Sequence, residues 1–180
     1  MTQAQSASLA TSTLPAPPLV ECDLFSYSPA PRRPDRAAQL ICVAEKLLAV
    51  LCQGQALDAR TLRAAMVSAF GGSDSEGVWN LKDVYEAQEL SALLFVRKYR
   101  AALARREPMA VLATLEKLQS LMATQTRRSD RSQRWQQFST PLPLGYVVAQ
   151  AAGLEANDVV LEPSAGTGLL ALFAQGVASG

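Results

Sequence analysis

The sequence contains no histidine among its 180 residues. This absence excludes catalytic triads built on histidine and zinc or iron sites with histidine ligands. The three cysteines, Cys22, Cys42 and Cys52, are odd in number and lack the spacing of a metal-binding motif. We expect them to be reduced, structural thiols of a cytoplasmic protein, and we expect no metal site.

Long apolar runs and a strong net charge are also missing. No apolar run approaches the roughly 18 residues that a membrane-spanning helix needs. The N-terminus lacks the basic and then apolar pattern of a signal peptide, so we expect a cytoplasmic protein without a membrane partner. With 17 basic and 16 acidic residues the formal charge is +1, and any attraction to nucleic acid must therefore be local.

Composition and apolar periodicity divide the chain. Residues 1–34 are rich in Pro, Ser, Thr and Ala, which predicts a mostly disordered leader. Residues 35–125 repeat apolar side chains at helical spacing and predict a helical domain. The first expected helix starts near Asp35 and stops at Gly54. The second starts at Asp58 as an N-cap and stops at Gly71-Gly72. The third runs from near Leu81 to about Arg106, and the fourth starts at Pro108. Residues 126–136 form a basic linker.

The segment 137–180 carries the most informative pattern. A helix is expected over 141–152, where Thr140 would be the N-cap and Pro141 the first helical residue. Asp158-Val-Val-Leu161 is a short apolar run, typical of a strand buried in a parallel sheet. Glu162 closes that run, a turn of small residues follows, and a buried helix is expected from Leu169.

The turn Gly166-Thr-Gly168-Leu-Leu-Ala171 fits the loose G-x-G-x-x-G/A pattern of phosphate- and cofactor-binding turns. Glycines let a ligand approach the backbone, and the N–H groups at the start of the next helix favour an anionic group. ATP fits poorly, because no Lys-Ser/Thr pair follows the glycines. A dinucleotide and S-adenosylmethionine both remain possible ligands, and Glu162 favours S-adenosylmethionine. A tight turn without a ligand is a further interpretation.

Two motifs in this region resemble a known family. Leu161-Glu-Pro-Ser-Ala-Gly-Thr-Gly168 is similar to the first cofactor motif of the adenine-N6 DNA methyltransferases, and Gln137-Phe-Ser-Thr-Pro141 is similar to the motif that precedes it. The resemblance implies S-adenosylmethionine as cofactor and DNA as partner. The cofactor-binding residues that it implies are Phe138, Ser139, Thr140, Pro141, Glu162, Pro163, Ser164, Gly166 and Gly168.

A wider stretch, from Ala69-Phe-Gly-Gly-Ser-Asp74 to Pro141, resembles the N-terminal methylase-like region of bacterial strawberry-notch-type proteins. In those proteins a DEAD/DEAH-type helicase follows the methylase. The Asn/Asp/Ser-Pro-Pro-Tyr/Phe motif that holds the target amino group in the family does not occur in this sequence. We therefore expect the front part of a longer protein, with no catalytic residue and no activity of its own.

The basic linker is a candidate nucleic-acid contact. Its arginines, Arg127, Arg128, Arg131 and Arg134, could meet phosphates, although a solvated hydrophilic linker has the same composition. The fold class that follows is mainly α, leading into the start of an α/β Rossmann-like methyltransferase domain. The alternative is a helical DNA- or protein-binding module with a vestigial cofactor site.

Overall fold

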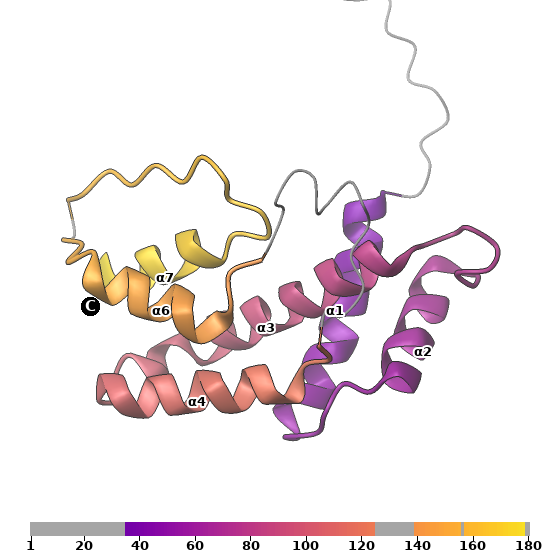
Figure 1. The fold of residues 1–180 in the computed structure, drawn as a ribbon, viewed down its shortest axis with the longest axis horizontal. Helices are drawn as coiled ribbons and strands as arrows, with labels where there is room; N and C mark the ends of the chain where they lie inside the picture. The colour runs from indigo at the N-terminus through magenta and orange to yellow at the C-terminus, as the bar shows by residue number, and fades with distance from the viewer. Residues whose placement is uncertain (1–34, 125–138, 156, 179–180) are drawn as a thin grey trace, which may run out of the picture. The chain divides into compact units, whose positions relative to one another are not determined.

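A computed structural model describes residues 35–124, 139–155 and 157–178 of the chain. The leader 1–34 and the basic linker, with its four arginines and the adjoining Phe138, lie outside the described residues. Within the described ranges the fold is all-helical and has six α-helices (Figure 1). None of them is long and apolar enough to cross a membrane.

The first two helices begin and end where local sequence rules put them. Helix α1 spans Arg36–Cys52, and the Asp35 side chain accepts a hydrogen bond from the amide of Ala37 at its N-terminus. Helix α2 spans Ala59–Phe70; its N-cap Asp58 accepts from the Thr61 amide at 2.7 Å. Gly71 ends α2 in the left-handed conformation with φ 75°, a geometry that favours glycine.

The next two helices are joined by a short turn. Helix α3 spans Leu81–Leu103 and starts with a reciprocal capping box, in which the side chains of Asn80 and Asp83 each bond the other's backbone amide. It ends at Leu103, three residues before the expected end. Helix α4 spans Pro108–Leu121 with proline at its first position, as the sequence predicts.

The buried Asp83 has one partner besides its own helix start. Its side chain is about 5% exposed and pairs with the guanidinium of Arg36 on α1, where Arg36 Nε donates to Asp83 Oδ1 at 3.0 Å. Arg36 also lies over the Phe70 ring, 5.7 Å from its centroid. The ion pair links the starts of α1 and α3, and the contact of Arg36 with the Phe70 ring adds the end of α2.

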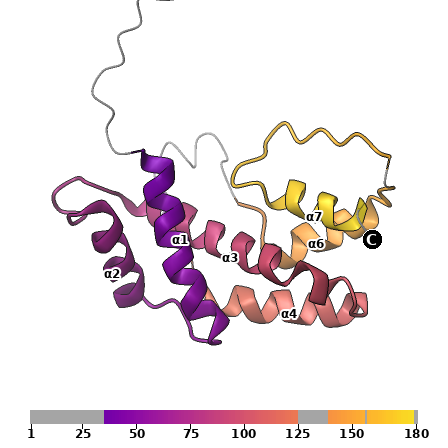
Figure 2. The same ribbon diagram turned by 180° about the vertical axis from the view of Figure 1, so that it is seen from behind.

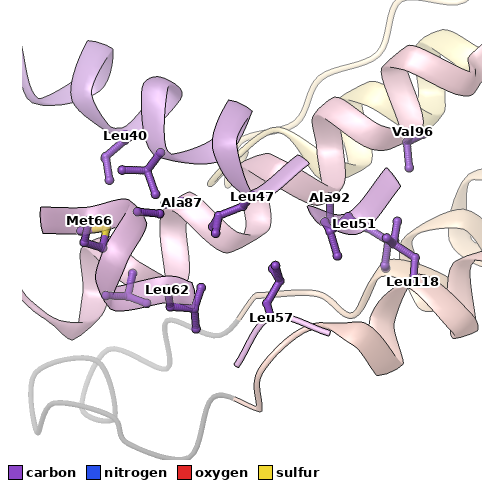
Figure 3. Close-up of a cluster of buried hydrophobic side chains, with 14 of the residues drawn as sticks. Leu40, Leu47, Leu51, Leu57, Leu62, Met66, Ala87, Ala92, Val96 and Leu118 are labelled. Carbon is purple, nitrogen blue, oxygen red and sulfur yellow. The ribbon is translucent and has the colours of Figure 1, made fainter. Parts of the chain in front are cut away.

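The core lies around α1, which packs mainly against α3 and also against α2. Figure 3 shows Leu47 and Leu51 of α1 in one apolar cluster with Ala92 of α3 and Leu118 of α4. Leu57, in the α1–α2 connection, is 2% exposed, and its amide donates to the Leu121 carbonyl at 2.7 Å. Each such buried leucine contributes about 1.5–3 kcal/mol, so the α1–α4 core is the main source of stability.

Helices α6, Leu142–Ala151, and α7, Leu169–Ala178, pack against each other. They also contact α4 and α3, respectively, and their side chains Leu142, Ala149 and Phe173 join the same apolar cluster as the core of α1–α4. Figures 1 and 2 both show the connection between α6 and α7 running back along the two helices.

The expected strand 158–161 is not formed. These residues carry neither helix nor strand, and Val159 and Leu161 are 99% and 85% exposed. A strand needs a neighbour to bond its N–H and C=O groups, and no strand occurs in the described ranges. The expectation of a buried parallel strand is therefore wrong for this structure, and the all-helical part of the fold class is what remains.

Candidate functional site

The candidate site is the turn from Glu162 to Gly168, which leads the extended segment into α7. The half-buried Glu162 accepts a hydrogen bond from the Ser164 amide at 2.9 Å through its Oε1 atom. This bond folds the Glu-Pro-Ser corner back on itself. Pro163, Ser164 and Gly166 are exposed, so the corner faces solvent with its backbone accessible.

The two glycines of the turn have backbone conformations that other residues rarely adopt. Gly166 has φ 54° and Gly168 has φ 93°. A Cβ atom added at Gly168 would meet no heavy atom within 4 Å, and one at Gly166 would meet only the Ser164 carbonyl, at 3.8 Å. Glycine is needed here for the backbone path, and the space beside it is open to a ligand.

The start of α7 supplies hydrogen-bond donors beside this turn. The Gly168 amide bonds the Ala165 carbonyl at 2.7 Å, and the Leu172 amide bonds the Gly168 carbonyl at 2.9 Å. The amides between these two precede the helical ladder and point out of the helix N-terminus. The turn therefore combines one carboxylate with amide donors, a set suited to a zwitterionic ligand end with an ammonium and a carboxylate.

The second expected motif lies just before α6. Ser139 is exposed, Thr140 is half-buried, and Pro141 is the N-cap residue of α6. The expectation of Thr140 as N-cap and Pro141 as first helical residue is wrong by one position. The Leu142 amide donates a hydrogen bond to the Gln119 side chain of α4 at 3.0 Å.

Packing of α6 against α7 brings the two motif-bearing helices together. A Cβ atom at Gly145 of α6 would lie 3.0 Å from Leu169 Cδ2 and 3.4 Å from Phe173 Cδ2, so glycine permits this approach. The Tyr146 and Phe173 rings meet edge to face with centroids 5.7 Å apart. Early residues of α6 thus contact early residues of α7, and the two helices run parallel with their N-termini at the same end.

The turn also contacts the helical core. Thr167 donates a hydrogen bond through Oγ1 to Glu89 Oε2 of α3 at 3.4 Å. The candidate turn is therefore held at two places, by α7 against α6 and by this contact with α3.

Two open grooves lie on the described surface, and neither is lined by the residues of the turn. One, of about 280 Å³, lies where the middle and last turns of α6 and α7 meet α3 and α4, and it is lined in part by Tyr146, Gln150 and Gly176. Burial raises the pKa of the Tyr146 hydroxyl. The turn itself lies apart from this groove, at the N-terminal end of α7.

Three residues that position the site were not expected from the sequence. Gln119 and Glu89 each form a hydrogen bond to a segment distant in the sequence, and no motif in the residues around them predicts these bonds. Gly145 had a usable signal, because a glycine inside an apolar helix costs about 1 kcal/mol and marks a close approach.

The described residues contain no group of three or more acidic or cysteine side chains that could hold a metal ion. Comparisons with known proteins return no match, whether to a protein-family model, to a curated protein or to a solved structure.

Proposed function

We propose that this chain is the cofactor-binding front part of an adenine-specific, S-adenosylmethionine-dependent DNA methyltransferase-like protein, fused in its full-length form to a DEAD/DEAH-type helicase. The observation that carries the proposal is the turn Glu162–Gly168. It couples a carboxylate, two positive-φ glycines and the amides of a helix start, in a sequence that resembles the first cofactor motif of this family.

The arrangement of α6 and α7 supports the same proposal. In an α/β methyltransferase domain, a helix, an extended segment and a second helix follow one another, with the two helices parallel and the segment antiparallel to both. Residues 142–178 follow this path, although the extended segment is not paired as a strand. Its exposed Val159 and Leu161 suit a segment that receives strand partners from outside the described residues.

The turn fits the methionine end of S-adenosylmethionine. Glu162 would accept from the ammonium group, and the amides at the start of α7 would meet the carboxylate. Ser164, Gly166 and Gly168 would line this end, with Pro163 fixing the corner and Phe138, Ser139, Thr140 and Pro141 closing over it. The methyl group belongs to the cofactor, while the residues of this chain only bind and orient it.

Hydrogen exchange with S-adenosylhomocysteine tests this proposal on the protein expressed to the end of its natural reading frame. We expect slower amide exchange in residues 137–170 when this ligand is added. Gly168→Asp should abolish the effect, because it places a charged side chain in the open space beside the turn and strains a backbone at φ 93°. Unchanged exchange in the unsubstituted protein would refute the proposal.

Two matched variants separate ligand contact from general damage. Gly153→Asp makes the same change at a glycine with φ 59° outside the turn, and should keep the protection. Glu162→Gln should weaken binding, whereas Glu155→Gln removes an exposed carboxylate elsewhere and should not.

The alternative is a helical DNA-binding module with a vestigial cofactor site. One observation favours it: the last part of α3 and the residues after it carry five exposed cations, Arg97, Lys98, Arg100, Arg105 and Arg106, and no acid between them. This reading predicts DNA binding that weakens with salt, persists after deletion beyond residue 135 and is indifferent to the cofactor.

A further inference from the structure

The larger of the two grooves runs between α3 and α4, and the end of α1 closes one side of it. It has a volume of about 560 Å³ and no residue of the cofactor turn takes part in it. Its floor includes Leu51 of α1 and Leu118 of α4, both buried in the core. The groove is therefore an open part of the stable helical core.

The wall from α4 is a continuous stripe along one helix face. It consists of Ala110, Ala113, Thr114, Lys117, Leu118 and Leu121. These residues alternate in steps of three and one, which keeps them on one face over three turns, or about 16 Å of helix. The first two turns carry only small side chains, so another helix could approach the α4 backbone closely.

The wall from α3 is aromatic. The rings of Phe95 and Tyr99 lie with centroids 4.7 Å apart, and Lys98 Nζ lies 5.6 Å from the Tyr99 centroid. The Tyr99 hydroxyl donates to Cys52 Sγ at 3.6 Å, and this hydrogen bond raises the pKa of Tyr99. The hydroxyl therefore already has a partner, and this wall offers mainly apolar contact.

The Thr114 hydroxyl, on the α4 wall, is bonded within the groove as well. Thr114 Oγ1 donates to the Ala110 carbonyl at 2.8 Å and accepts from Arg106 Nη1 at 2.9 Å. A base or sugar would need free donors and acceptors on the floor for recognition. An apolar side chain does not, and the groove suits it better.

Charge at the groove has one sign. Arg106 and Lys117 line it, and Lys98 lies beside it with Nζ 3.7 Å from Cys52 Sγ. All three cations are exposed, and no acidic residue is among those that line the groove. A partner with carboxylates on both flanks of an apolar stripe matches this surface.

We propose that this groove binds an acidic amphipathic helix of a partner protein, about three turns long. Its apolar residues, at spacings of three and four, pack against Phe95, Tyr99 and the α4 stripe, and its carboxylates pair with Lys98, Arg106 and Lys117. The inference does not depend on the cofactor, because the turn Glu162–Gly168 lies on other elements.

Fluorescence anisotropy with a labelled model peptide tests this inference on the full chain. The probe is an amidated helix of about 14 residues, with leucine at helical spacing and glutamate on both flanks. We expect saturable binding of this peptide, weakened by salt, and no binding of the same peptide with lysine for glutamate. Lys117→Glu should weaken binding of the acidic peptide about tenfold.

Two further variants make the result specific to the groove. Ala113→Trp fills the groove at an exposed position and should weaken binding at least about tenfold without loss of helix content by circular dichroism. Arg60→Glu, an equal charge reversal on exposed α2, should leave binding unchanged. Failure of the acidic peptide to bind would overturn the inference. The inference would also be overturned if Lys117→Glu weakened binding of a DNA duplex but left binding of the acidic peptide unchanged.

Discussion

Gln88 of α3 provides a strong test of how the helical core is held together. Its side chain is 1% exposed and bonds both backbone groups of Ala123, donating to the carbonyl at 2.8 Å and accepting from the amide at 2.9 Å. These two bonds hold the segment after α4 against α3. The substitution Gln88→Leu keeps a similar volume but removes both bonds.

The expected cost is about 2–3 kcal/mol of the free energy of unfolding. Each hydrogen bond contributes about 0.5–1.5 kcal/mol net, and leaving a half-buried amide and carbonyl without partners adds a desolvation cost of about 1 kcal/mol or more. Against a total stability of about 5–15 kcal/mol for a domain, this loss is large. It corresponds to a fall in Tm of about 4–12 °C for a chain of this length.

Urea unfolding followed by far-ultraviolet circular dichroism measures the change. The unfolding midpoint should fall while the slope with urea stays the same, because the compactness of both states is unchanged. Gln55→Leu, at an exposed glutamine in the α1–α2 connection, is the matched control and should stay within about 0.5 kcal/mol. A Gln88→Leu loss as small as that of the control would refute this account of the α3–α4 connection.

Two other predictions concern a helix contact and a helix cap. Gly145→Val should destabilise the packing of α6 on α7 by about 1–3 kcal/mol, because a side chain there overlaps Leu169. Gly176→Ala adds a Cβ atom that meets no atom within 4 Å, and it should stabilise α7 by up to about 1 kcal/mol. Amide hydrogen exchange in α6 and α7 should be faster in the Gly145→Val variant and slower in the Gly176→Ala variant. The hydrogen bond from the Thr61 amide lowers the pKa of Asp58, so its stabilising effect is present above the unfolded-state pKa and is lost as the pH falls below about 4. Asp58→Asn retains a capping side chain but does not titrate, and a urea midpoint that depends on pH as steeply as that of the unsubstituted protein would contradict this assignment.

The sequence by itself determined the local events of this fold. Helix α2 begins at Asp58 and ends at Gly71, and α4 begins at Pro108, because caps, left-handed glycines and first-turn prolines act within a few residues of the chain. Apolar side chains at helical spacing also identified the buried face of α1, with Leu40, Leu47 and Leu51.

Only the tertiary structure decided the features that depend on a partner distant in the sequence. The run Val159–Leu161 has the composition of a strand, but a strand forms only when a neighbour bonds its backbone, and the described residues supply none. At the start of α6, one residue later than expected, the Leu142 amide bonds Gln119, 23 positions away in the sequence. The groove between α3 and α4 arises in the same way, since spacing within α4 gives its stripe but only packing brings Phe95 and Tyr99 opposite to it.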